Sequence, residues 1–144
     1  MSSNLSAGAP GVHGPGKALV ELYLSHEEQT SIWIFIERDR RDYPILVRFS
    51  QDLYGPKGDF ELDSLGQDGL QDEIRKLREK INQEMSSPSA MRRVAQWIEN
   101  ERVNGTNFKV EGLSPQSALV GLKRVGEFVH QAKKNGWLVW GETD

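Results

Sequence analysis

The sequence predicts an α+β fold in which strands come first and helices follow. Residues 18–50 hold three runs in which apolar side chains recur at every second position, the period of a strand. Residues 70–135 hold three apolar stripes at helical spacing, and short apolar segments follow at residues 108–111 and 137–140. We therefore predict an N-terminal antiparallel three-stranded meander, then helix, helix, strand, helix and strand, in a single mixed sheet covered by helices.

Composition indicates one folded unit preceded by a tail. The chain has 144 residues, of which 27% are charged and 37% hydrophobic, values typical of globular proteins. Residues 1–17 are rich in Gly and Pro and have too little apolar surface to offset the entropy of ordering. We expect a flexible tail over residues 1–17 and a single α+β domain over residues 18–144.

The N-terminal part of this domain carries the predicted meander. The first strand is expected over residues 18–24. Residues 30–38 have isoleucines on one face and aromatic side chains on the other, so both faces need cover and a central strand is predicted. Residues 43–50 alternate in the same way and complete the meander, and residues 59–62 add a short strand.

The C-terminal part carries three predicted helices, the first over residues 70–84. A serine followed by proline at 87–88, and again at 114–115, combines an N-cap with a proline at the first helical position. Asn-Gly pairs at 104–105 and 135–136 are expected to end these two helices. The strands on either side of the third helix have crossover spacing, so they are predicted to lie parallel.

The first of these helices has two interpretations. Its narrow apolar stripe, flanked by charges, has the alternating spacing of a coiled-coil seam, yet a helix that faces its own core makes the same pattern. The stripe consists of Leu70, Ile74, Leu77 and Ile81. Because it covers only two heptads, we favour the core-facing interpretation over a partner helix.

The predicted element order resembles the ribonuclease H-like topology, in which three antiparallel strands precede a helix, a parallel strand, another helix and a final strand. The resemblance implies a nuclease whose carboxylates clamp two metal ions about a phosphate. Glu21, Glu73 and Glu111 fall near the implied positions, but the first-strand Asp of that family is absent. Solvated surface glutamates are the alternative interpretation, and we favour it because topology alone does not imply function.

A cluster of arginines between the second and third predicted strands is a candidate interaction surface. Arg38, Arg40 and Arg41 lie there among acidic neighbours. With the aromatic side chains of the predicted sheet they could form a stacking platform with phosphate contacts, as in single-strand nucleic-acid binders. Those aromatic residues are Trp33, Phe35 and Tyr43. A net charge of −3 does not favour this alternative, because such domains usually present a basic face.

Trp140 is a second candidate contact residue. It lies in the last predicted strand, which we expect at an edge of the sheet. An exposed edge can accept a strand from a partner protein.

Several function classes find no support in the sequence. The chain has no Cys, which excludes thiolate zinc sites and Cys nucleophiles, and its three His are scattered without metal-ligand spacing. We assign no catalytic residue, no metal ligand and no cofactor. No apolar run reaches the length of a membrane span, and no signal peptide is recognisable, so we expect no membrane association and a cytoplasmic location.

These observations favour a protein without enzymatic activity. We expect an adaptor, regulatory or assembly protein that acts through contacts with a protein partner, which the sequence does not identify. A nucleic-acid-binding protein that uses the arginine cluster is the first alternative. A ribonuclease H-like, metal-dependent nuclease is the second.

Overall fold

The computed structural model describes residues 3–10, 18–51, 61–103 and 112–143. Within these ranges it contains five α-helices, one short 3-10 helix and four strands, so the predicted α+β class is confirmed. The strands are β1 (Ser3–Gly8), β2 (Val20–Tyr23), β3 (Glu61–Leu62) and β4 (Leu138–Thr143). The helices are α1 (His26–Ile36), η1 (Arg40–Asp42), α2 (Pro44–Gln51), α3 (Ser64–Met85), α4 (Pro88–Val103) and α5 (Pro115–Lys134).

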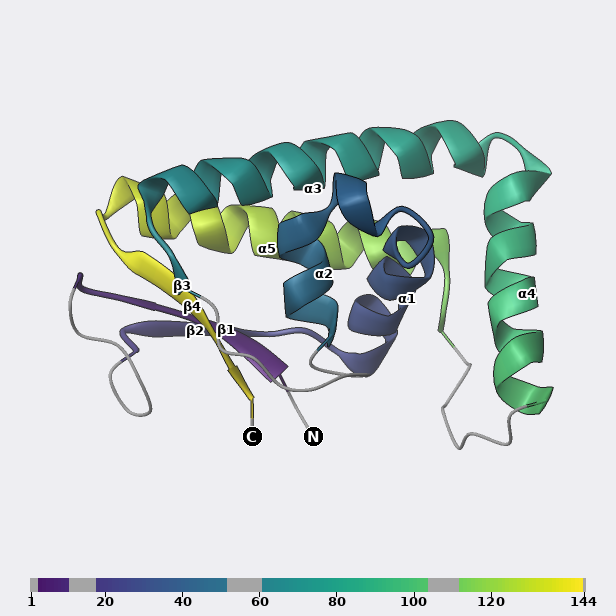
Figure 1. Ribbon diagram of the computed structural model, residues 1–144, viewed down its shortest axis with the longest axis horizontal. Helices are drawn as coiled ribbons and strands as arrows, with labels where there is room; N and C mark the ends of the chain where they lie inside the picture. Colours follow the sequence, from purple (N-terminus) through teal and green to yellow (C-terminus); the bar gives the residue numbers. More distant parts are fainter. Residues whose placement is uncertain (1–2, 11–17, 52–60, 104–111, 144) are drawn as a thin grey trace.

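The strands form one sheet in the order β2-β1-β4-β3, and all neighbouring pairs are antiparallel. The sheet lies at one end of the long helices α3 and α5, and α4 packs near the other end of α3 (Figure 1). The described strands therefore do not form the predicted mixed sheet. The strand expected over residues 108–111 lies outside the described residues.

Strand β1 corrects the prediction of a flexible tail for residues 3–8. It lies between β2 and β4, so its backbone pairs on both sides. Leu5 and Ala7 are fully buried beneath it. Two buried apolar side chains are enough to hold this strand in place, because β2 and β4 supply its backbone hydrogen bonds. The local sequence pattern of residues 3–8 does not reveal these pairings.

Helix α1 replaces the central strand predicted over residues 30–38. Every residue from 28 to 36 is buried. Residues 32–36 are five consecutive apolar side chains, a run that a buried helix produces as readily as a strand does. The helix begins at a capping box: the Ser25 hydroxyl accepts from the Glu28 N–H, and the Glu28 carboxylate accepts from the Ser25 N–H.

Helix α2 replaces the third strand, predicted over residues 43–50. Pro44 occupies the first helical position, where its missing N–H costs nothing. The next N–H groups, of Ile45 and Leu46, donate to the carboxylate of Glu73 on α3. A strand assignment failed because this cap comes from a residue far along the chain. Without the two strands, the meander and the ribonuclease H-like order are both wrong.

The three C-terminal helices are confirmed, although α3 begins at Ser64, earlier than expected. Asp63 caps it by accepting from the Gly66 N–H, and Ser114 caps α5 in the same way from the Ser117 N–H. Leu70, Ile74, Leu77 and Ile81 are all buried. The stripe of α3 therefore faces the core, as favoured above.

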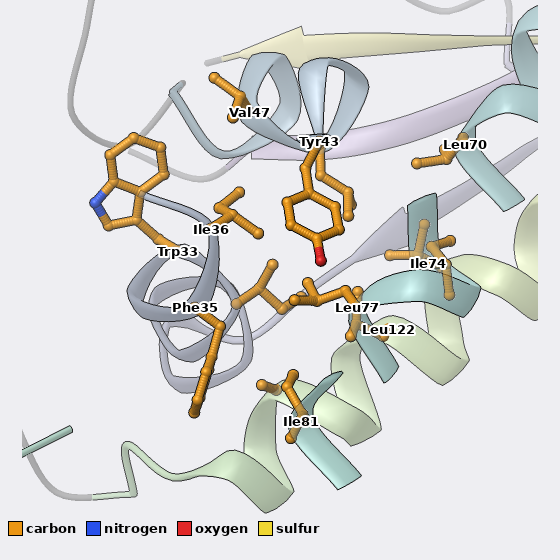
Figure 2. Packing of buried hydrophobic residues seen from close by; sticks show 14 of the residues in the cluster. Trp33, Phe35, Ile36, Tyr43, Val47, Leu70, Ile74, Leu77, Ile81 and Leu122 are labelled. Carbon is orange, nitrogen blue, oxygen red and sulfur yellow. The ribbon is translucent and has the colours of Figure 1, made fainter. Parts of the chain in front are cut away.

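The core lies where α1, α2, α3 and α5 meet. Figure 2 shows Ile36 from α1, Leu77 from α3 and Leu122 from α5 converging around Tyr43, which immediately precedes α2. None of the helices in the described ranges has both the length and the apolarity needed to cross a membrane.

Helices α1 and α5 approach closely at Gly121. A Cβ there would lie 3.0 Å from Ile32 Cδ1 and 3.1 Å from Glu28 Cβ. The Ser31 hydroxyl on α1 also accepts from the N–H of Ser114 at the start of α5. Gly126, about one and a half turns further along α5, is different. A Cβ atom added there would have Gln71 Oε1 as its nearest neighbour at 3.4 Å, an ordinary van der Waals distance.

This contrast gives a paired prediction. We expect Gly121→Ala to lose about 1–3 kcal/mol of unfolding free energy by overpacking, more than the gain of up to about 1 kcal/mol from helix propensity. Gly126→Ala should instead gain about 0.5–1 kcal/mol, because its Cβ fits. Urea denaturation of both variants measures the difference, and equal effects of the two substitutions would contradict the described α1–α5 contact.

Candidate functional site

The candidate arginines lie on one turn, residues 38–42, which joins α1 to α2 and is called the arginine turn below. It contains the short helix η1. Arg38, Arg40 and Arg41 are all exposed. The sequence-based prediction of an exposed charged turn is therefore correct in location, although helices rather than strands flank it.

Two of the three arginines are tied to the protein. Arg38 donates from Nη2 to Gln96 Oε1 on α4 at 3.3 Å. Arg40 donates from Nε to the Glu37 carbonyl oxygen at 3.3 Å, and its guanidinium lies 5.0 Å from the Trp33 ring centroid. Arg40 thus places a cation at the C-terminal end of α1, where the helix dipole favours it.

Arg41 differs from both. It makes no hydrogen bond or ion pair to any residue in the described ranges. Its backbone is nevertheless held within η1, and the other two arginines of the turn, Arg38 and Arg40, are anchored as above. Arg41 is therefore a cation on an ordered turn that no described residue pairs with.

One acidic side chain of the turn, that of Asp39, is held by a cation from a neighbouring helix. Asp39 forms an ion pair with Lys80 on α3, and this hydrogen bond lowers the pKa of Asp39. Glu37, just before the turn, responds in the opposite direction: burial raises its pKa, and nearby Glu101 adds to the rise. The Nζ atoms of Lys76 and Lys80 also lie 5.7 and 5.9 Å from the Tyr43 ring centroid.

Glu73 holds the start of α2, the helix that follows the arginine turn. Its carboxylate is buried and accepts the Ile45 N–H at 3.0 Å and the Leu46 N–H at 3.0 Å. Burial raises the pKa of Glu73, although the two backbone donors partly offset it. Glu73 is therefore a structural cap for α2, because its oxygens are occupied by the backbone.

The nuclease carboxylates are not brought together in the part of the chain that is described. Glu73 caps α2, Glu21 is exposed on the edge strand β2, and Glu111 lies outside the described residues. Within the described ranges, no three His, Cys, Asp or Glu side chains are placed so that they could hold a metal ion together.

The aromatic residues proposed for base stacking lie in the core. Trp33, Phe35 and Tyr43 are at most 6% exposed, and α1 rather than a sheet carries the first two. The arginine turn therefore has no stacking platform made of these three side chains, which removes one of the two features on which the nucleic-acid alternative depended.

Trp140 is not on an edge. Strand β4 lies between β1 and β3, with Trp140 opposite Ser6 on one side and Glu61 on the other. Its side chain is 3% exposed. The edge-strand argument for Trp140 is wrong, because β1, which the sequence analysis assigned to a tail, occupies one flank of β4.

A groove lies between α3 and α5, and the sequence patterns did not predict it. It has a volume of about 530 Å³. Arg78 from α3 and His130 from α5 line it, and neither has a hydrogen-bond or ion-pair partner among the described residues. The two residues are far apart in sequence, so only the antiparallel packing of α3 on α5 brings them to one surface (Figure 1).

Comparison with known proteins gives no relative. No protein family matches the chain, and no curated protein and no solved structure is significantly similar to it. Any functional assignment therefore has to rest on the residues of this chain.

The role of Glu73 leads to a prediction. Glu73→Ala should cost about 1–3 kcal/mol of unfolding free energy, because the buried N–H groups of Ile45 and Leu46 lose their acceptor. Glu73→Gln should cost less, since an amide oxygen still accepts. Thermal and urea unfolding measure both losses, and a loss for Gln as large as for Ala would contradict the capping role.

The same site predicts a pH dependence. The folded-state pKa of Glu73 is raised above its ordinary value of 4.5, so its contribution is fully present below that value and is lost as pH rises through the folded pKa. The stability advantage of the wild type over Glu73→Gln should therefore shrink between acidic and neutral pH. An advantage that grows over this interval would contradict the burial of a charged carboxylate.

The arginine turn predicts a division of roles. Arg40→Gln should lose about 0.5–1 kcal/mol of unfolding free energy with its Trp33 contact. Arg41→Gln should change it by less than about 0.5 kcal/mol, as is usual for a free surface side chain. Urea denaturation distinguishes them, and a larger loss for Arg41→Gln would reverse the assignment.

Proposed function

We propose that this protein is a non-enzymatic adaptor, regulatory or assembly protein that binds a protein partner through the arginine turn. The single observation that supports this most is Arg41: it is exposed, unpaired within the described ranges, and held on an ordered turn. Arginine is enriched among residues that dominate binding energy. A turn that is ordered before binding loses little entropy when a partner docks.

Charge indicates what the partner presents. Asp39 is satisfied by Lys80, and Arg38 and Arg40 are anchored to the protein. Among the three arginines of the turn, Arg41 is therefore the one left to meet an acidic counterpart, and we propose that the partner offers a carboxylate there. The cytoplasmic location expected above stays a prediction.

The test uses the full chain, tagged and recovered from its native host, with Arg41→Glu as the variant. We expect the wild type to form a complex of defined mass with a second protein. Charge reversal should weaken it on the order of tenfold or more, the effect of losing one strong interface contact. Lys134→Gln is the control, because Lys134 is exposed and unpaired in the described ranges but lies at the far end of α5.

Two outcomes would contradict the proposal. One is a protein that remains monomeric with no co-purifying partner. The other is a complex that nuclease treatment dissolves and that weakens steeply with salt, which would favour the nucleic-acid alternative.

A further inference from the structure

The groove between α3 and α5 runs along the side of α3 opposite Lys76 and Lys80. Its lining residues on α3 include Gln71, Ile74 and Arg78, at the spacing of one helical face. A smaller hollow shares these three and extends the groove to Asn82. At 1.5 Å per residue, the stretch from Asp68 to Asn82 is about 21 Å long, the length of about six residues of extended chain.

The charges along this groove are unequally satisfied. Lys133 on α5 is paired with Asp68 on α3 at one end, and Lys123 lies 4.0 Å from Glu127. Arg78 and His130 have no such partner among the described residues. The groove therefore presents an uncompensated cation between charge pairs that already neutralise each other.

Its floor contains a glycine that packing does not require. Gly126 lies within α5, where glycine costs about 1 kcal/mol relative to Ala. In contrast to Gly121, a Cβ here would meet nothing closer than 3.4 Å. The Gly126 carbonyl accepts from Gln71 Nε2 at 2.8 Å, which leaves Gln71 Oε1 to accept a hydrogen bond. A bare backbone at this point suits the close approach of another chain.

We propose that this groove binds an extended acidic segment, about six residues long, of a partner protein. Arg78 contacts a carboxylate, the Gln71 Oε1 atom accepts a backbone N–H, and the segment passes over Gly126. Ile74 and Val129 lie at the base of the groove but are almost fully buried, so the contacts to the segment are mainly polar. A nucleic acid fits less well, because no Trp, Tyr or Phe side chain lines the groove to stack on a base.

The test measures binding of a fluorescein-labelled hexaglutamate peptide to the full chain by fluorescence anisotropy at low ionic strength. We expect saturable binding that Arg78→Gln weakens on the order of tenfold, the effect of one charge-assisted contact. Gly126→Leu should weaken it comparably by filling the floor, while its thermal unfolding shows that the fold persists. Arg92→Gln on α4 is the matched control, exposed and unpaired in the described ranges, and should bind as the wild type does.

Amide chemical shifts in an NMR titration locate the site independently of affinity. Changes centred on α3 and α5 near Gln71 and Gly126 support the proposal. Changes centred on the arginine turn would overturn it and leave the proposed function intact, and Arg41→Glu should leave hexaglutamate binding unchanged. Absence of peptide binding, equal binding by Arg78→Gln, or tighter binding of a labelled six-nucleotide single-stranded DNA would each overturn it.

Discussion

The carboxylate of Glu73 is the contact on which the candidate site depends. It takes the place of a local N-cap for α2 by accepting two backbone N–H groups from a different helix. Because α2 begins where α3 holds it, the preceding turn runs between fixed points, with Tyr43 inserted into the core. The position of Arg41 is in this sense set by a buried acid on another helix.

The parts of the fold that the sequence predicted are those with local causes. Helices α3, α4 and α5 each combine an amphipathic stripe with a cap or a proline near the start, and all three are present. Helices α1 and α2 were mistaken for strands. The apolar run of α1 has no polar face to reveal its period, although its Ser25 and Glu28 capping box was a local signal for a helix, and the cap of α2 lies on α3.

The candidate site, too, was predicted only where its features have local causes. The arginine turn was found because a run of charges between apolar segments marks an exposed loop, whichever elements flank it. Trp140 was misplaced because its neighbours on β1 are set by tertiary pairing. The groove was not found because Arg78 and His130 line it from two different helices, and the sequence of one helix does not show which of its faces packs against the other.

Strand β1 also governs the order in which this protein can assemble. Its two neighbours join it in pairings of very different contact order: β2 follows closely in the chain, whereas β4 ends at Thr143. During synthesis β1 can pair with β4 only after α1 to α5 have been made, because β4 follows all of them in the chain. Pairing of β1 with β4 closes a long loop, which costs entropy before the strand contacts form. Docking of α5 on the other helices is the step that brings β4 close to β1.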